Sequence, residues 1–269
     1  IKINPYISMI NKKFRFKNTH KVLFDCANGS ISTFYKEINF LSNTKIINTN
    51  FKKNKINDNC GTNFLKKNLK KTYYKFFEYC LAFDGDGDRL SVSKKNYGVI
   101  ETEKLALIYY LYLNKKKNIV GTEITNPWLK EKLELVGKKL YLTKVGDRNV
   151  INKKKKINAA FGFETSGHFC FNDTMDGLFS AGLFLEILNK KKSIILDVLK
   201  MKISYSNLVY RTENKNFFLI KNKIQNSSNH KVIIRRSIWE EILKIYVFYK
   251  KKNPQLNKIQ KFLEKISLK

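Results

Sequence analysis

Short apolar runs alternate with amphipathic stretches along the first three quarters of the chain. This alternation is typical of βαβ units, in which helices cover a mainly parallel sheet. In the first unit it predicts strands at 21–25, 44–48 and 80–84 and helices near 31–40 and 63–78. A turn near 94–98 then separates this unit from the next.

The second unit repeats the alternation, and the last quarter of the chain departs from it. The second unit is expected to contain helices near 103–114, 127–136 and 176–189 and strands near 118–121, 139–143 and 158–163, with Asp176 capping the last helix. The last quarter reads as strands at 206–211, 217–221, 231–235 and 242–249 before a helix near 254–267. We therefore predict two tandem α/β units with mainly parallel sheets, then a small α+β domain. The expected domains are residues 1–98, 99–202 and 203–269.

Composition narrows the class of protein. The chain has 269 residues, 43% of them hydrophobic and 13% aromatic, which is enough for about two ordinary domains with real cores. No run approaches the ~20 apolar residues of a membrane helix, and the first five residues lack a signal-peptide pattern. We therefore expect a cytoplasmic protein with no membrane partner. The four scattered cysteines indicate reduced thiols rather than disulfides or a zinc site.

The formal net charge of +31 raises the question of nucleic-acid binding. Only six of the 53 basic residues are arginine, and the lysines are spread along the whole chain. An AT-rich genome under compositional drift would produce this on any fold, whereas evolved nucleic-acid binders concentrate charge on one face or motif. We therefore expect no specific nucleic-acid partner, although a basic nucleic-acid-binding protein stays as a further alternative.

The segment 81–89, LAFDGDGDR, carries the strongest chemical signal. Three carboxylates at Asp84, Asp86 and Asp88 follow an apolar run, and placing them so close together costs repulsion unless a cation neutralises them. Aspartate supplies hard oxygen ligands, and the intervening glycines let the backbone curl. A calcium EF-hand loop does not fit, because it needs Gly at Arg89 and Glu at Lys95. A Mg²⁺ site for phosphate chemistry is favoured over a solvated acidic turn.

Five stretches together resemble the α-D-phosphohexomutase family, and its phosphoglucosamine mutase branch in particular. Besides the metal loop at 81–89, they are 22–29 (VLFDCANG), 55–62 (KINDNCGT), 143–148 (TKVGDR) and 162–168 (GFETSGH), with Asp176-Gly177 following as in the family's "GDG" helix start. They occur in the family's order. The resemblance implies interconversion of glucosamine 6-phosphate and glucosamine 1-phosphate through a bisphosphorylated intermediate, for UDP-N-acetylglucosamine and cell-wall synthesis.

The resemblance also implies a role for each matching residue. Asp84, Asp86 and Asp88 would be the ligands of Mg²⁺, and Arg89 would contact the phosphoserine or the transferring phosphate. Substrate-binding residues would come from two loops, Lys144, Gly146, Asp147 and Arg148 in one and Glu164, Ser166 and His168 in the other. Two structural alternatives stay open, namely an N-cap role for Asp147 and a backbone-satisfied imidazole for His168.

Two departures from the family pattern bear on activity. The family's Thr-Ala-Ser-His-Asn-Pro phosphoserine loop, expected ahead of residue 1, does not occur in this sequence. Near the C-terminus, 235–241 (RRSIWEE) aligns with the "RxSGTEP" phosphate loop, so Arg235 and Ser237 match, but Ile238 and Trp239 replace its Gly and Thr. We therefore expect no mutase turnover from this chain alone. The alternative is a non-catalytic or split-enzyme remnant that binds magnesium and sugar phosphate, completed by a separate first-domain polypeptide.

Overall fold

A computed structural model describes most of the chain, namely residues 4–42, 44–113, 117–224, 230–237, 241–250 and 254–268. By their contacts, the residues form two compact units. The first comprises Ile1–Thr122 and Lys138–Met201, and the second comprises Glu123–Gly137 and Lys202–Lys269. Among the described residues, no helix combines the length and apolar character needed to cross a bilayer.

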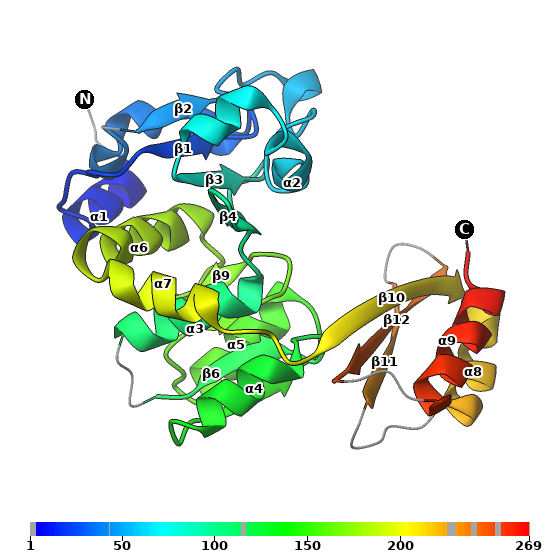
Figure 1. The fold of residues 1–269 in the computed structure, drawn as a ribbon. Coiled ribbons are helices and arrows are strands. Elements are labelled where there is room, and N and C mark those ends of the chain that lie inside the picture. Colours follow the sequence, from blue (N-terminus) through cyan, green and yellow to red (C-terminus); the bar gives the residue numbers. More distant parts are fainter. Residues whose placement is uncertain are drawn as a thin grey trace. The chain divides into compact units, whose positions relative to one another are not determined.

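The first sheet of unit one has the strand order β2-β1-β3-β4-β5 (Figure 1). Its strands are β1 (Val22–Asp25), β2 (Lys45–Ile47), β3 (Tyr79–Phe83), β4 (Leu90–Lys94) and β5 (Gly98–Val99). β1 pairs in parallel with β2 and β3, whereas β3–β4 and β4–β5 are antiparallel. All three predicted strands of this segment are therefore present, and β4 is an addition that places residues 84–89 in a hairpin connection.

The two helices predicted in this segment are wrong. Residues 31–40 form three separate 3₁₀ turns, η1 (Ser30–Thr33), η2 (Tyr35–Glu37) and η3 (Asn39–Leu41). Residues 63–78 form the single-turn helix α2 (Leu65–Asn68) and η5 (Thr72–Phe76), and η4 (Lys53–Lys55) precedes them. Both segments contain runs such as Ser-Thr-Phe-Tyr and Thr-Tyr-Tyr, whose β-branched and aromatic side chains lose rotamer freedom in a helix. Tertiary packing therefore holds short turns there instead.

The second sheet of unit one has the order β7-β6-β8-β9. Its strands are β6 (Ile119–Thr122), β7 (Leu140–Thr143), β8 (Gly162–Phe163) and β9 (Phe169–Cys170). β6 pairs in parallel with β7 and β8, and β8–β9 is an antiparallel hairpin. Helix α5 (Asp147–Lys156) packs on β6, β7 and β8. The predicted mainly parallel α/β character is confirmed.

Three further helices pack together beside these strands. They are α3 (Thr102–Leu113), α6 (Gly177–Lys190) and α7 (Lys192–Lys200), and α6 also contacts β3 and β4 of the first sheet. The carboxylate of Asp176 accepts a hydrogen bond from Phe179 N at 2.8 Å, which confirms the predicted cap of α6. Helix α7 was not predicted, because only Lys191 separates it from α6.

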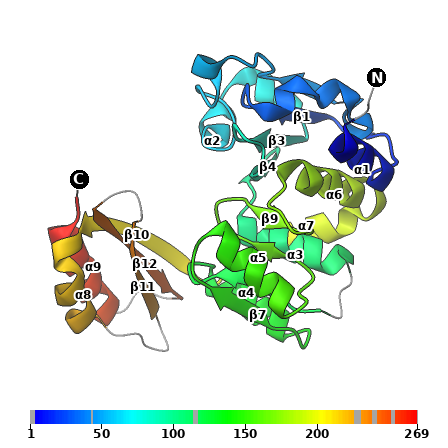
Figure 2. The ribbon, with the colours of Figure 1, turned by 180° about the vertical axis from the view of Figure 1, so that it is seen from behind.

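Helix α1 (Pro5–Lys13), which the sequence pattern did not predict, lies beside α6 in both views (Figures 1 and 2). Its start has a clear local cause: Pro5 occupies the first turn, and the Asn4 side chain accepts from Tyr6 N at 2.9 Å. The fully buried ring of Phe14 packs edge-on against Phe179 of α6, with ring centroids 5.1 Å apart. α1 is thus part of the first unit's core.

The second unit contains an antiparallel sheet covered on one face by helices. The strand order is β10-β12-β11, with β10 (Ser206–Glu213), β11 (His230–Arg236) and β12 (Ile242–Tyr249). Its other elements are α4 (Pro127–Glu134), η6 (Asn214–Asn216), α8 (Phe217–Lys223) and α9 (Pro254–Ile266). Residues of α8, α9 and the strands form one apolar core, and this confirms the expected α+β character of the C-terminal part.

The strand predicted at 217–221 is wrong, because this segment is α8. Ile220 and Ile224 are four residues apart and face the core, whereas Phe218 and Leu219 are 69% and 42% exposed. A strand would bury every second residue instead, so the spacing of the buried positions selects a helix.

Candidate active site

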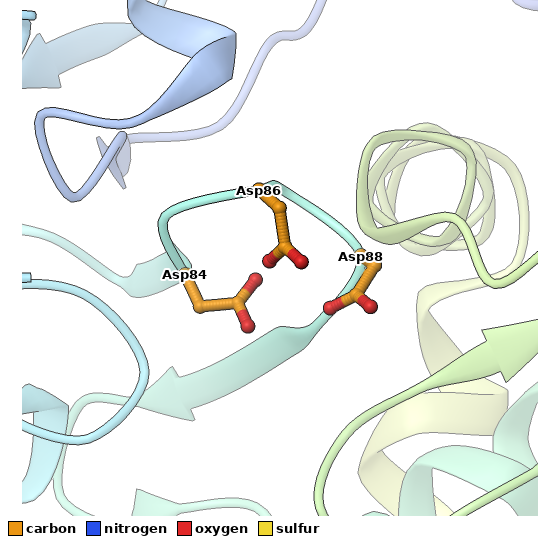
Figure 3. Close-up of side chains that lie close together, drawn as sticks. All are labelled: Asp84, Asp86 and Asp88. Atoms are coloured by element: carbon orange, nitrogen blue, oxygen red, sulfur yellow. The ribbon is translucent and has the colours of Figure 1, made fainter. Parts of the chain in front are cut away.

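The loop between β3 and β4 brings three aspartates together. Asp84 follows the last residue of β3, and Asp86 and Asp88 lie on the way to β4. One carboxylate oxygen from each lies within 4.8 Å of the others. Figure 3 shows the three carboxyl groups on the inner side of this loop, facing one another. Gly87, between the last two, has φ +81°, a conformation that favours glycine.

Main-chain contacts from distant segments hold this metal loop. Ser30 N donates to Gly85 O and Ser30 Oγ donates to Asp86 O, each at 2.7 Å. From the other side, Gly177 N at the start of α6 donates to Gly87 O at 3.1 Å. A Cβ atom at Gly177 would lie 2.6 Å from Gly87 O, so only glycine permits this approach. These contacts connect the loop to the residues after β1 and to the start of α6.

The electrostatics of the loop reflect three close negative charges. Burial, together with the charges of Asp88 and Asp86, raises the pKa of Asp84 to about 6, despite a hydrogen bond from Arg89 N. The Arg89 side chain also lies against this carboxylate, with Nε 3.1 Å from Asp84 Oδ2. A divalent cation among the three carboxylates would remove the repulsion that disfavours ionised Asp84.

The donor set fits such a cation. All three groups offer carboxylate oxygens, which Mg²⁺ prefers. One oxygen, Asp88 Oδ1, is buried and lacks a hydrogen-bond donor in the described part of the chain. The nearest nitrogen, His168 Nε2, lies 3.1 Å away but is within hydrogen-bonding distance of Arg89 Nε at 3.0 Å. An oxygen of this kind is suited to accept a metal ion.

His168 joins the metal loop to a second predicted loop. Its Nε2 contacts Arg89 and Asp88, while its Nδ1 lies 2.8 Å from Ser166 Oγ and 3.2 Å from Glu164 Oε2. Burial lowers the pKa of His168, but the carboxylates of Asp88 and Glu164, 3.1 and 3.2 Å from its ring nitrogens, outweigh this and raise it to about 9. The ring nitrogens therefore contact side chains, and the alternative of an imidazole satisfied by backbone is wrong.

The sugar loop predicted at Glu164, Ser166 and His168 is the turn of the β8–β9 hairpin. Glu164 is 6% exposed, and its Oε1 accepts from Gly146 N at 2.7 Å. This bond ties the hairpin turn to the other predicted substrate loop. Ser166 is exposed and faces solvent beside His168. The structure thus brings the two loops together through Glu164.

The other substrate loop connects β7 to α5. Lys144, Asp147 and Arg148 are exposed there, and Gly146 adopts φ +129°. Helix α5 begins at Asp147, so Gly146 occupies the N-cap position and the N-cap alternative for Asp147 is wrong. The Asp147 carboxylate instead accepts from Arg148 N at 2.7 Å. Exposed polar side chains are thus presented next to the buried Glu164.

Asp25, which sequence reasoning missed, braces the segments around the metal loop. Its buried carboxylate lies at the end of β1 and accepts from Ala27 N (3.0 Å), Asn48 Nδ2 (2.8 Å), Gly61 N (2.9 Å) and Tyr74 Oη (3.3 Å). The turn that it holds leads directly to Ser30. An acid directly after the apolar run 22–24 was the signal available in the sequence.

The predicted phosphate-loop residues lie in the second unit. Arg235 is in β11, and Ser237 follows the strand with its N–H donating to Ile242 O at 2.9 Å. Positions 238–240 of this loop lie outside the described residues. Arg236 stacks on the Phe217 ring with its guanidinium carbon 4.7 Å from the ring centroid. Arg236 thus points to the helix side of the sheet, opposite to Arg235.

Comparison with known proteins identifies the family of this chain. Residues 101–203 match the model of the phosphoglucomutase/phosphomannomutase alpha/beta/alpha domain III. Curated phosphoglucosamine mutases from Dictyoglomus thermophilum and Thermotoga maritima are 33% and 30% identical over 85% and 97% of this chain. The chain belongs to the α-D-phosphohexomutase superfamily. It spans 54% and 64% of the length of these two relatives.

Solved phosphohexomutase structures share the fold. The N-acetylphosphoglucosamine mutase of Aspergillus fumigatus, solved with GlcNAc-6P and magnesium, matches with a TM-score of 0.77 at 15% identity, over 97% of this chain and 64% of that one. A phosphoglucomutase/phosphomannomutase family protein from Burkholderia thailandensis gives 0.72 at 20% identity, over 97% and 62%. The predicted fold class is therefore confirmed for this phosphohexomutase chain.

Proposed function

We propose that the chain provides the magnesium site and the sugar-binding loops of a phosphoglucosamine mutase, which interconverts glucosamine 6-phosphate and glucosamine 1-phosphate. The observation that carries the proposal is the position of His168. Its Nε2 lies 3.1 Å from Asp88 of the metal loop, and its Nδ1 lies 3.2 Å from Glu164 of the sugar loop. One imidazole thereby couples the group that would hold the metal to the group that would hold the sugar.

The residues of the chain have separable tasks in this proposal. Asp84, Asp86 and Asp88 would hold Mg²⁺, which when bound offsets charge on the oxygens of a transferring phosphoryl group. The Arg89 side chain contacts Asp84, Asp88 and His168 through Nε, and its two terminal nitrogens would donate to a phosphate. The exposed side chains of Asp147 and Arg148 would hydrogen-bond the sugar substrate.

The reaction also needs a residue that carries the phosphoryl group. The family uses a phosphoserine in its first domain, and the sequence of this chain has no such loop. The proposal therefore includes a first domain, supplied by the same gene or by a separate polypeptide, and a bisphosphorylated sugar as the intermediate. Without that serine, nothing in the chain receives or donates the group.

Binding of glucosamine 6-phosphate to the 269-residue chain in Mg²⁺ tests the sugar loops. Arg148→Gln should weaken binding about fivefold, because a charge-assisted hydrogen bond to the ligand is lost. Lys156→Gln is the matched control, since it removes the same charge from an exposed site on the same helix. Equal affinities for the two variants, or no preference for glucosamine 6-phosphate over inorganic phosphate, would contradict the proposal.

Turnover separates an enzyme from a binding remnant. A coupled assay for glucosamine 1-phosphate should detect none with the chain alone and some after addition of the first domain of the Thermotoga maritima relative. An unlinked domain lacks the roughly millimolar effective concentration of a tethered one, so the restored rate should rise with its concentration. Sugar-phosphate binding without any restored turnover would instead identify a non-catalytic binding protein.

A further inference from the structure

A row of three basic side chains crosses the antiparallel sheet of the second unit. Arg211 of β10 is the direct cross-strand partner of Lys244 of β12, and Lys244 is the direct partner of Arg235 of β11. Directly opposed residues of an antiparallel pair point to the same face of a sheet. The three side chains therefore form one row, here called the cation row, on a single face.

This face is the one opposite to α8 and α9. Leu243, Ile245 and Val247 of β12 are fully buried in the core formed with α8 and α9. Since side chains alternate along a strand, Lys244 lies on the other face, together with its partners Arg211 and Arg235. Figures 1 and 2 both show α8 and α9 on one side of this sheet only. Arg211 is exposed and the other two are partly exposed, so a ligand can reach the row.

The row concentrates positive charge at one place on the sheet. Neighbouring strands are about 5 Å apart, so the three basic groups lie within about 10 Å of one another, which favours an anionic ligand. The use of arginine points to the kind of anion. Only six of the 53 basic residues of the chain are arginine, yet two of the three in this row are. The planar guanidinium fork matches the oxygens of a phosphate, which lysine does not.

The adjacent row on the same face indicates what the phosphate is attached to. Val209, Tyr246 and Ile233 are direct cross-strand partners, two residues along each strand from the cation row. Val209 is 51% exposed and the other two are partly exposed. An apolar and aromatic row beside the cations suits a compact carbon body that carries one phosphate group, such as the ring of a sugar phosphate.

We propose that Arg211 and Lys244 join Arg235 in binding the phosphate of a hexose phosphate on the face of this sheet opposite to α8 and α9. The inference rests on the proposed function and deepens it. Arg235 belongs to the predicted phosphate loop, but Arg211 and Lys244 lie on other strands and are new assignments. They supply donors where Ile238 and Trp239 replace the glycine and threonine of the family loop.

The test measures binding of glucosamine 6-phosphate, inorganic phosphate and unphosphorylated glucosamine to the full chain by calorimetry. Arg211→Gln should weaken glucosamine 6-phosphate binding about tenfold, because a charge-assisted contact is lost. Lys221→Gln is the matched control: it removes one charge from an exposed position of α8, on the helix side of the same unit. It should change affinity less than about twofold. Glucosamine binding should be unchanged in both variants.

Each outcome separates this inference from the proposed function. If Arg148→Gln weakens glucosamine 6-phosphate binding but Arg211→Gln and Lys221→Gln do not differ, the cation row is wrong and the proposed function stands. If Arg211→Gln weakens the binding of inorganic phosphate and of glucosamine 6-phosphate equally, and the wild type binds both with the same affinity, the row binds phosphate but the proposed function fails. A short single-stranded oligonucleotide that binds through Arg211 without competition from glucosamine 6-phosphate would overturn the inference in favour of nucleic acid.

Discussion

Replacing Asp86 with asparagine tests the proposed metal site separately from the stability of the fold. Asp86 is exposed, whereas Asp84 is 8% exposed, so Asp86→Asn removes a charge without opening the core. In metal-free buffer the variant should be as stable as the wild type or slightly more stable. The reason is that one of three carboxylates lying within 4.8 Å of one another is neutralised. The gain should be at most about 1 kcal/mol, since an exposed charge is well screened.

Addition of Mg²⁺ should reverse this order. A cation present at about 100 times its dissociation constant stabilises the wild type by about 2.7 kcal/mol. For a unit the size of the first one, this corresponds to a rise in melting temperature of about 5–10 °C. Asp86→Asn retains two of the three ligands and should lose most of that rise. The wild type should therefore melt above the variant in Mg²⁺ and no higher than the variant without it.

Thermal unfolding with and without MgCl₂ measures this reversal, with NaCl at equal ionic strength as the baseline because the chain carries a formal charge of +31. Asp197→Asn is the matched control, since it neutralises an exposed aspartate that pairs with Lys200 at 3.7 Å on α7, in the same unit. The reasoning is refuted if Asp86→Asn keeps the full response to Mg²⁺, or if Asp197→Asn loses it.

Three further predictions follow from contacts around the site. Gly177→Ala should weaken Mg²⁺ binding at least about fivefold, because its Cβ would lie 2.6 Å from Gly87 O; an unchanged Mg²⁺ titration would contradict this. Asp25→Asn should lower the free energy of unfolding by about 3 kcal/mol, measured in urea, since an amide group would face donors that now bind a carboxylate; an unchanged urea midpoint would show that these bonds contribute little. Lys192→Gln should lower the free energy of unfolding by less than about 1 kcal/mol at pH 7. Burial raises the pKa of Glu78, but Lys192, 2.7 Å away, outweighs this and lowers it. The stabilisation by this ion pair is therefore present above the unfolded-state pKa of about 4.3 and is lost as the pH falls through the folded-state pKa. Unfolding of both proteins across a pH series measures it, and a difference that persists at low pH would be the wrong result.

Features with local causes could be predicted from the sequence. The convergence of the three aspartates is one, because they follow an apolar strand directly and are spaced by glycines. The cap of α6 by Asp176 is another. The helix predicted at 31–40 failed because its amphipathic spacing was judged without the cost of its β-branched and aromatic residues. The strand predicted at 217–221 failed because four consecutive apolar residues fit either period.

Features that depend on distant partners could not be predicted. Arg89 and His168 meet across 79 positions of sequence, and Asp25 accepts from Gly61 across 36. No local pattern encodes such a pairing. The cation row likewise depends on the register of two strand pairs, and a shift of one residue would place Lys244 on the helix side. The sequence indicates the residue types for the chemistry, and the fold decides which of them meet.

The supports of the metal loop have a consequence for how the site tolerates mutation. Gly85 O and Gly87 O accept from the main-chain N–H groups of Ser30 and Gly177. Any residue except proline provides an N–H group, so replacing most side chains near these contacts leaves the bonds in place. Sensitivity then concentrates at the glycines that allow close approach, where a Cβ at Gly29 would lie 2.2 Å from Gly85 O. A scaffold held in this way can accumulate lysine and asparagine across its surface while the loop of the three aspartates keeps its shape.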